Sequence, residues 1–492
     1  MQIITSFPLV KIFIILLSAF SMPLIHNRRH IKIISIIFLS FSLTLSLITL
    51  NYVFRNGAFY FNAGYPDTFL GIQLYIGPVE TLLSSVLEFV ILVVVWFSAF
   101  SIDEEIRQNR IKFFYILIHL LTASILGIIY TNDIFNGYVF IEVAALASCG
   151  IIVIKEKKEN IKAATKYIIM STIGSGLLLM GIAFIYSYTG HLNMDLIHLE
   201  ILEGYDDYFK SLLIIVALYT AGLGVKSAMF PLHIWLPDAH SSAPTASSAL
   251  LSGVVLKGFA YFLIKFMDRM LGFEIINQLN ILPIILILGS SGMIFGSLSA
   301  IFQKNIKRLI AYSSVAQMGY IFLAIGLGSP FGAVIAVYHM MGHAVTKSAL
   351  FLCSGLMIEK TGKNEISNYR GLGFEMPITF ILFTLGALSM VGIPILPGFI
   401  SKWYLSIESI QLGKFLLIFV ILLSSLLNAV YYFPIIINGF FGIENLENRV
   451  YKSKRAPYEK LAPIIVLITA MLVLGIFSKD VLDFLITGIN AL

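Results

Sequence analysis

The chain has few charged residues. Of its 492 residues, 12% are Asp, Glu, Lys or Arg and 58% are hydrophobic, whereas a soluble globular protein has about 25% charged residues. This deficit excludes a soluble fold. It predicts an all-α protein that crosses the lipid bilayer many times, because helices satisfy their own backbone hydrogen bonds in lipid.

Cysteine is also scarce, and the chain lacks a polar domain. Cys149 and Cys353 lie in separate apolar stretches without a CxxC or Cys/His spacing, so neither a disulfide framework nor a zinc site follows from them. The loops are too short to hold a nucleotide, flavin or iron–sulfur domain, and we expect no cofactor. The net charge of +6 comes without a basic patch that interleaves with aromatic residues, so we expect no nucleic-acid partner.

Apolar stretches long enough to span the bilayer, about 20 residues each, predict fourteen helices. We interpret 399–411 as the second half of a broken twelfth helix and the following residues as the thirteenth. The first stretch contains Lys11 and lacks a small-x-small cleavage site, so it is a retained helix and not a signal peptide. The first eleven expected spans are 7–25, 31–53, 79–100, 112–130, 134–154, 161–187, 210–235, 244–267, 276–301, 305–328 and 331–358. The twelfth is 374–395 together with 399–411, the thirteenth is the rest of 399–440, and the fourteenth is 461–488.

In this topology, loops rich in lysine and arginine alternate with loops that contain few of them. Loops that follow odd-numbered helices hold 21 of the 33 lysines and arginines, at 28–32, 107–112, 155–162, 304–308, 360–370 and 449–460. By the positive-inside rule these loops face the cytoplasm, and both termini face the outer side.

Several ionisable residues lie inside the expected spans, where a charge costs about 2.5–3.5 kcal/mol on insertion scales. We therefore treat them as functional candidates. Snorkelling, with the amine reaching the interface, is the alternative; it explains Lys166 and Lys265 and fits Lys11. The deep residues are Lys226, Lys257, Lys347, Lys402 and Glu142.

Proline interrupts two of the expected helices. The seventh contains Pro231 and Pro237, with Lys226 five residues before Pro231. The twelfth contains Pro394 and Pro397, with Lys402 five residues after Pro397. This reversed order indicates an inverted repeat, and transporter sites lie at such discontinuous helices. Two ordinary proline kinks are the alternative.

The remaining candidates form a constellation of titratable and polar groups. Glu142 needs a partner, and we expect Lys226 on a neighbouring helix to be that partner. His339, His343 and Lys347 are spaced by four residues, which places them along one helical face over about 12 Å. The HxxxH spacing lacks a third metal ligand, and haem would need a histidine on a second helix. Weaker candidates are Glu88, His240, Ser313 and Gln317, with Glu80 expected at the interface.

Four stretches resemble signatures of a known family: KSAMFPLHIWLPDAH, KRLIAYSSVAQMGY, HMMGHAVTKSALFL and GIPILPGFISKW. They are similar to the antiporter-like subunits of respiratory complex I, of Mrp-type sodium/proton antiporters and of membrane-bound hydrogenases. The resemblance implies N-terminal helices in 1–111, inverted five-helix repeats in 112–267 and 276–440, and a last helix in 461–492. It also implies a proton path through Glu142, Lys226, Lys257, His339, His343, Lys347 and Lys402.

Differences from the sequence patterns of some family members indicate which type of subunit this chain resembles most. One complex I subunit type has lysine where Glu142 stands, and another has glutamate where Lys402 stands. The D-type subunit of an Mrp antiporter, or its counterpart in a hydrogenase or related complex, fits best. This resemblance implies a multi-pass protein of a prokaryotic plasma membrane, with other membrane subunits as partners, among them further antiporter-like subunits, and protons or also sodium as the ion. A complex I pump, an independent secondary transporter, a redox subunit and a structural subunit stay open as alternatives.

Overall fold

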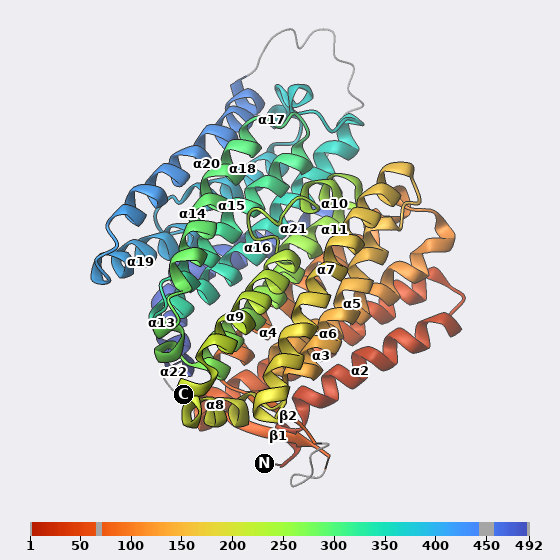
Figure 1. The fold of residues 1–492 in the computed structure, drawn as a ribbon. Helices are drawn as coiled ribbons and strands as arrows, with labels where there is room; N and C mark the ends of the chain where they lie inside the picture. Colours follow the sequence, from red (N-terminus) through yellow and green to blue (C-terminus); the bar gives the residue numbers. More distant parts are fainter. Residues whose placement is uncertain (1, 65–70, 442–456, 490–492) are drawn as a thin grey trace.

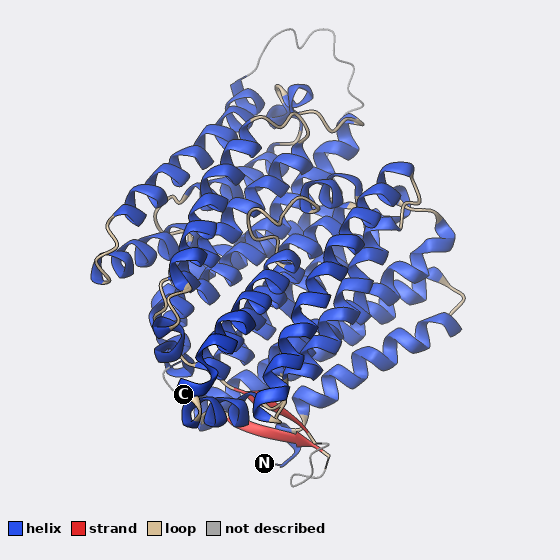
Figure 2. Cartoon of the chain, viewed as in Figure 1, coloured by secondary structure: helices blue, strands red, loops and turns tan. Residues whose placement is uncertain are grey.

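The computed structural model describes residues 2–64, 71–441 and 457–489, and helices make up most of them (Figures 1 and 2). Among these residues, thirteen helices are long and apolar enough to cross a membrane, and one shorter apolar helix, α18 (Pro377–Val391), accompanies them. This confirms the prediction of an all-α, multi-pass membrane protein. The basic cluster at 449–455 lies outside the described residues.

The first half of the bundle begins with α1 (Gln2–Thr5). Its further helices, some long and some short, follow in chain order. They are α2 (Phe7–Ser21), α3 (Arg28–Asn56), α4 (Pro78–Glu105), α5 (Ile111–Tyr130), α6 (Ile134–Val153), α7 (Lys158–Thr189), α8 (Met194–Glu203), α9 (Tyr205–Lys226), α10 (Leu236–Ser242), α11 (Thr245–Leu250) and α12 (Leu256–Lys265).

The second half repeats this alternation of long helices and short connectors. It contains α13 (Phe273–Gln278), α14 (Leu282–Ile301), α15 (Ile306–Gly326), α16 (Pro330–Thr361), α17 (Leu372–Glu375), α18, α19 (Pro397–Gln411), α20 (Leu416–Phe441), α21 (Tyr458–Ile476) and α22 (Ser478–Ile489).

Local sequence explains where several of these helices begin and end. Asp133, Asn305 and Ser329 accept a backbone N–H through their side chains at the starts of α6, α15 and α16, as N-cap residues do. At the end of α16, Gly362 adopts φ of +69°, a left-handed conformation that glycine reaches without steric cost.

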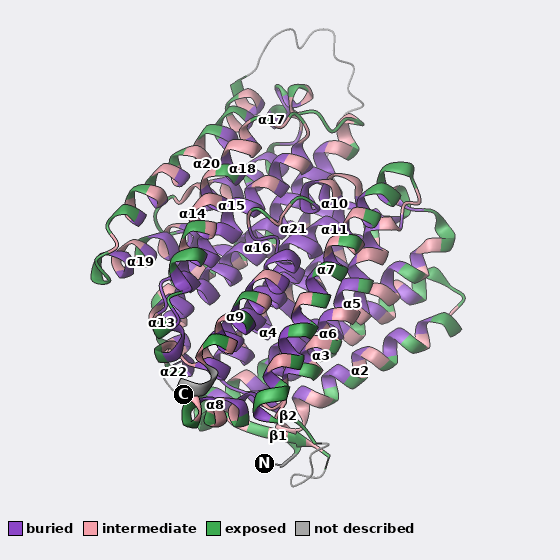
Figure 3. Ribbon diagram, viewed as in Figure 1, coloured by how far each residue is buried: buried purple, intermediate pink, exposed green. Residues whose placement is uncertain are grey.

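The most buried helices lie at the centre of the bundle (Figure 3). The apolar window of Thr245–Leu271, which includes α11 and α12, is 100% buried, and those of α15 and α16 are 94% buried. Peripheral helices bury far less, with 28% for α20 and 33% for α3. Exposed Leu, Ile and Phe side chains on these helices form an apolar outer surface of the kind that faces lipid.

Close packing within the second half depends on small residues. A Cβ on Gly289 would come within 2.6 Å of the Leu323 backbone nitrogen, and one on Gly319 within 2.6 Å of that of Met293. α14 and α15 therefore approach each other at backbone distance, as membrane helices with small interface residues do.

Both proline-interrupted helices are broken. The expected seventh helix does not continue to residue 235: α9 ends at Lys226, and α10 begins at Leu236. The expected twelfth helix divides into α18 and α19, with Gly392 at φ of +99° in the break. Proline removes the backbone donor that helix continuation needs, so both interruptions follow from Pro231, Pro237, Pro394 and Pro397.

The last expected helix differs from the prediction because it is two helices. α21 ends at Ile476, and the separate α22 packs against α4 and α16. α22 carries Lys479, Asp480 and Asp483 on its exposed side, so only its apolar face is buried.

A β-hairpin was not predicted. β1 (Phe59–Ala63) pairs antiparallel with β2 (Ile72–Ile76), with Phe59 opposite Ile76. Figure 1 shows the hairpin, α8 and the end of α22 at the same end of the bundle, which we call the hairpin end.

Candidate functional site

The first broken helix is held in place by three tertiary contacts. The indole N–H of Trp235 donates to the carbonyl of Val225 at 2.9 Å, across the break. Asp238, in the first turn of α10, accepts from Lys166 at 2.8 Å and from Arg308 at 2.9 Å. Lys166 thus lies in a partly exposed ion pair.

Glu142 and Lys226 form the predicted pair. Lys226 Nζ lies 3.0 Å from Glu142 Oε1 and donates to Ser171 Oγ at 3.1 Å, while Ser175 donates to the same carboxylate. The lysine side chain is 0% exposed, whereas that of Glu142 is 33% exposed. α6 and α9 therefore hold a buried ammonium against a carboxylate that reaches the side of the bundle.

Lys257 lies at the centre of the most buried helix. Its Nζ donates to the carbonyl of Ser252 in the π-helical segment Leu251–Val255, a local irregularity that is frequent at functional sites. Phe259, half a turn further along α12, has Lys226 Nζ 5.9 Å from its ring centroid. α12, which carries Lys257, therefore packs beside Lys226 through Phe259, on the other side of the helix from Lys257.

Serine residues of two helices lie between Lys257 and Lys347. Ser252 Oγ lies 2.8 Å from Ser314 Oγ on α15, and the neighbouring Ser313 accepts from Lys347. Lys347 also donates to the carbonyl of Ile310 at 3.0 Å. Ser313, a weaker candidate from the sequence, therefore lies between two of the principal ones.

His339, His343 and Lys347 follow one face of α16, as predicted. The rings of His339 and His343 are nearly parallel, with centroids 6.1 Å apart. His339 Nδ1 lies 2.8 Å from Ser401 Oγ on α19, directly before Lys402. The column thus runs from Lys347 to the second broken helix.

Lys402 closes the second break. Its Nζ donates to the carbonyls of Met390 at 2.8 Å and Val391 at 3.0 Å, at the end of α18, where a cation is favoured by the helix dipole. It also lies 4.8 Å from the ring centroid of Tyr320, a cation–π distance. In the described part of the chain, the ion pairs with carboxylates do not include Lys257, Lys347 or Lys402.

Four buried side chains near this series have polar atoms without a hydrogen-bond partner among the described residues. They are both ring nitrogens of His240 and His343, Nε2 of His339, and both amide atoms of Gln317. Buried polar groups in proteins are normally satisfied, often by ordered water. The surroundings of the column therefore suit a hydrated path, and His240 and Gln317 belong to them.

The structure corrects three sequence interpretations. Lys11 is not a snorkelling residue: it is 0% exposed and lies 2.7 Å from Glu88 Oε1. Lys265 is also buried, and donates to the carbonyls of Ile129 and Thr131. Glu80 is not at an open interface but is buried and accepts from Tyr261 at 2.6 Å. Their partners are far away in the sequence, so no local pattern could reveal them.

No cluster of three or more His, Cys, Asp or Glu side chains that could hold a metal occurs among the residues the structure describes. Cys149 and Cys353 are free. The arrangement of lysines, histidines and hydroxyls is suited to holding and passing protons, since each group can donate or accept one.

Comparisons with known proteins agree with this geometry. Residues 131–428 match the family model described as NADH:quinone oxidoreductase/Mrp antiporter, TM. The chain is 34% identical to NADH-quinone oxidoreductase subunit N of Desulforudis audaxviator over 441 residues, which cover 86% of this chain and 85% of that protein. It is 28% identical to the D-type subunit of the Na(+)/H(+) antiporter of Alkalihalophilus pseudofirmus over 437 residues, covering 88% and 86%.

A solved structure has the same fold. The chain superimposes on a chain of the membrane-bound sulfane sulfur reductase, an archaeal respiratory membrane complex, with a TM-score of 0.88 and 28% identity. The match covers 99% of this chain and 96% of the other.

Proposed function

Because the chain belongs to the NADH:quinone oxidoreductase/Mrp antiporter transmembrane family, we propose that it is the proton-translocating subunit of a multi-subunit ion-pumping membrane complex. The observation that carries this proposal is the near-continuous series of buried groups from Glu142 to Lys402. The series crosses both broken helices and includes Lys226, Lys257, Ser252, Ser314, Ser313, Lys347, His343, His339 and Ser401.

The two breaks give this series a physical rationale. A discontinuous helix in a membrane survives where it is packed in protein or lines a wet cavity, and ion sites of transporters lie there. Lys226 and Lys402 are each placed at one break. We regard 112–267 and 276–440 as inverted repeats, each of which supplies one broken helix and its lysine.

The proposed movement of protons follows the order of the groups. A proton enters from the cytoplasm near the first break, passes Lys257 and the column on α16, and reaches Lys402. It leaves outward when the Glu142–Lys226 pair rearranges. Lysine suits this task because its ammonium releases a proton when it is desolvated or meets another positive charge.

The basic loops give the proposed orientation. By the positive-inside rule the hairpin end faces outward, together with both termini, and the membrane is the plasma membrane of a prokaryote. Partners are other membrane subunits of the same complex, further antiporter-like subunits among them. The partly exposed Glu142 favours such a neighbour, because a carboxylate open to lipid is costly.

Two complexes are candidates for the assembly. An Mrp-type sodium/proton antiporter, or a hydrogenase-like complex with an equivalent module, agrees with the retained Glu142 and Lys402. The identity of 34% to an NADH-quinone oxidoreductase subunit N favours a redox-driven pump. Mass spectrometry of the native complex separates them by the catalytic subunits that co-purify: none with an Mrp-type antiporter, hydrogenase subunits with a hydrogenase-like complex, and dehydrogenase subunits with an NADH-driven pump.

Proton transport in vesicles tests the relay. The native complex carrying Lys226→Ala, Lys257→Ala or Lys402→Ala is assayed for formation of a pH gradient, with Lys210→Ala as the control. Lys210 is an exposed lysine on α9, the same helix as Lys226. We expect each relay variant to lose proton movement and the control to retain it; normal gradients in all three relay variants would refute the proposal.

Adding sodium to the same assay shows whether this subunit carries protons alone or also sodium. If this chain carries protons alone, loss of the relay leaves sodium movement through the remaining subunits without a counter-flow of protons. Radioactive sodium uptake measured in the Lys257→Ala complex therefore shows whether sodium also depends on this subunit.

A further inference from the structure

A second line of polar side chains leaves Lys257 toward the hairpin end of the bundle. Tyr261, Lys265 and Arg269 follow Lys257 at intervals of four residues, which places them on one side of the helix. The distance from Lys257 to Arg269 along the helix is about 18 Å. All four side chains are buried, so this line crosses the protein interior and not a lipid-facing surface.

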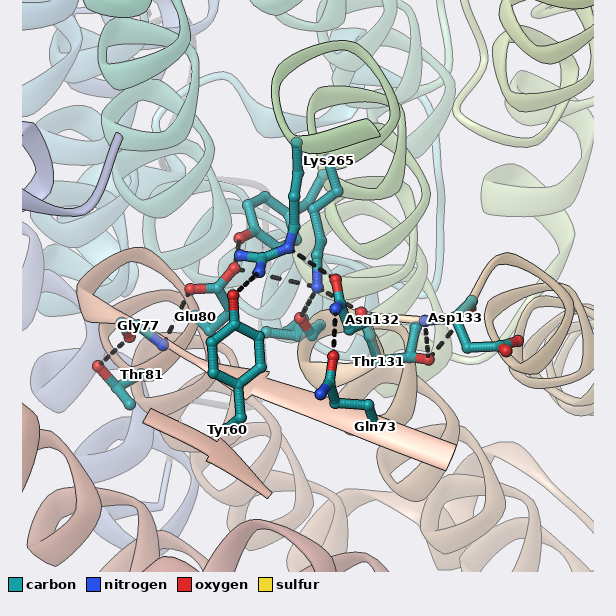
Figure 4. A network of polar contacts seen from close by, with 12 residues as sticks. Tyr60, Gln73, Gly77, Glu80, Thr81, Thr131, Asn132, Asp133 and Lys265 are labelled. Atoms are coloured by element: carbon teal, nitrogen blue, oxygen red, sulfur yellow. Dashed lines mark hydrogen bonds and ion pairs between the residues drawn. The ribbon is translucent and has the colours of Figure 1, made fainter. Parts of the chain in front are cut away.

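Glu80 of α4 joins this line. The Tyr261 hydroxyl donates to Glu80 Oε1 at 2.6 Å, and Lys265 Nζ lies 3.9 Å from the same oxygen. The other carboxylate oxygen accepts from the Gly77 N–H at 3.2 Å. Figure 4 shows Glu80 and Lys265 meeting above the hairpin, close to Tyr60. A carboxylate with a phenol and an ammonium beside it can take up and give back a proton.

The line ends at a small pocket at the hairpin end. Tyr75, Glu80, Lys265, Asp268 and Arg269 line this pocket of about 20 Å³, which is room for about one water molecule. Glu80 is therefore adjacent both to the buried phenol and to a pocket with room for one water molecule.

Of the other groups around the pocket, Asp268 is a second carboxylate that can take up a proton, whereas Tyr75, Lys265 and Arg269 do not compete for it. Burial raises the pKa of the Tyr75 hydroxyl to about 12, so this phenol stays protonated. Arg269 keeps its charge at any relevant pH, and it is held by Asp195 at 2.8 Å and by the Tyr60 hydroxyl at 2.6 Å. Lys265 is held by the carbonyls of Ile129 and Thr131.

We propose that Glu80 is the proton-release group of this subunit, and that Tyr261 passes it protons from Lys257. This inference rests on the proposed proton relay and adds to it an exit that branches off at Lys257, before the column on α16. It differs from release at the Glu142–Lys226 pair. Phe259, which faces Lys226, and Tyr261, which faces Glu80, are two residues apart on α12, and two residues are about half a helical turn.

The transfer conserves protons and charge. The Lys257 ammonium turns from the Ser252 carbonyl toward Tyr261, one helical turn away, and gives up one proton through a single bridging water. The Tyr261 hydroxyl accepts this proton as it donates its own to Glu80. Lys257 becomes neutral and the Glu80 carboxylate becomes a carboxylic acid, which then releases the proton to water in the pocket and regains its charge.

The test uses the intact complex in vesicles, with Glu80→Gln and Tyr261→Phe as variants. Each keeps the size of its side chain and removes one proton-transfer step. We expect proton translocation to fall about tenfold or more, within the range attributed to a single acid–base group. Glu80→Asp, which keeps the carboxylate, is expected to restore most of the rate.

Matched controls separate this effect from a general disturbance. Tyr219→Phe removes a buried hydroxyl that has no hydrogen-bond partner among the described residues, and Glu274→Gln neutralises an exposed carboxylate near the same end of the bundle. Both are expected to leave translocation within about twofold of wild type, since neither group takes part in the transfer.

A pH profile distinguishes proton release from a structural role. When the pH on the releasing side is lowered, the wild type is expected to slow as Glu80 holds its proton, with Tyr75, Tyr261, Lys265, Asp268 and Arg269 as the groups that face it. Glu80→Gln is expected to lose this dependence. A merely structural Glu80 would leave the profile unchanged in shape, and this result would overturn the proposal.

The remaining outcomes show which of the two proposals, the exit or the relay, is wrong. If Lys257→Ala stops translocation while Glu80→Gln and Tyr261→Phe do not, the exit is wrong and the relay stands. If these three variants and those at Lys226 and Lys402 all translocate normally, the proposed function itself fails. Native gels report assembly, and if Glu80→Gln does not assemble, the Tyr261→Phe rate alone decides.

Discussion

The two broken helices hold their lysines by different means. Lys226, at the first break, is paired with Glu142 and donates to Ser171, while Ser175 donates to the carboxylate, which is 33% exposed. Lys402, at the second break, has no carboxylate partner among the described residues but donates to two carbonyls at the end of α18. The first lysine is thus stabilised by a charge that can move or titrate, and the second by fixed backbone dipoles.

This difference suggests a division of labour between the two breaks. An ion pair separates when a proton or a neighbouring charge changes the balance between attraction and desolvation, so the first break is suited to switching. Carbonyl groups cannot change their charge, so the second break is suited to holding Lys402 as an ammonium once it has received a proton from the α16 column. The following predictions test this contrast.

The largest effect is expected when Glu142 alone is removed. Glu142→Ala leaves the fully buried Lys226 without a counter-charge, which costs about 3–5 kcal/mol for a buried pair. The melting temperature of the complex is expected to fall strongly, and proton transport to stop. The double variant Glu142→Ala/Lys226→Ala should regain stability but not transport; equal stability of the single and double variants would contradict the pairing.

The second break should respond differently to removal of its lysine. Lys402→Ala leaves two carbonyl groups without a donor, and we expect a loss of about 1–3 kcal/mol, smaller than for Glu142→Ala. Lys402→Arg should keep the carbonyl contacts and most of the stability, but stop transport, because arginine does not release its proton. Thermal unfolding and vesicle assays on the same preparations measure both. Transport by Lys402→Arg would show that Lys402 acts only as a helix cap.

An intermediate effect on proton transport is expected when the ion pairs that hold α10 in place are weakened. Asp238→Asn weakens the ion pairs with Lys166 and Arg308, which are partly exposed and each worth up to about 1 kcal/mol. Transport is expected to slow without stopping, since the relay groups remain. Glu203→Gln, which changes an exposed carboxylate at the end of α8, is the matched control. A complete loss of transport would place Asp238 in the relay.

The smallest effect is expected at Tyr320, beside Lys402. Tyr320→Phe keeps the ring below the ammonium and removes a hydroxyl with only long contacts, at 3.4 and 3.3 Å. Stability should change by less than about 0.5 kcal/mol, whereas Tyr320→Leu should lose about 0.5–2 kcal/mol of cation–π attraction. Equal unfolding midpoints for the two variants would remove Tyr320 from the Lys402 site.

Much of the site could be predicted because the signals were local. The spacing of His339, His343 and Lys347 is a helical period, and it predicts one face without knowledge of any neighbour. Pro231 and Pro397 break helices for reasons of backbone chemistry. Even the partner of Glu142 could be inferred, since few counter-charges lie inside spans.

Other parts could not be inferred because they depend on helices far apart in the chain. Lys11 has the pattern of a snorkelling residue, and only its contact with Glu88 shows that it is an internal ion pair. Glu80 and Tyr261 are separated by 181 positions, so nothing in either segment indicates their hydrogen bond. The hairpin was missed because its two strands of five residues lie between spans, outside the long apolar stretches on which the prediction was based.

By itself, the sequence determined that this protein is a bundle of membrane helices with two breaks and a set of buried charges, because hydrophobicity, helical period and proline chemistry are local properties. The tertiary structure decided which charges meet. Whether a lysine contacts a carboxylate, a carbonyl or a hydroxyl depends on how distant helices pack, and this choice separates Lys226 from Lys402 and joins Glu80 to Tyr261.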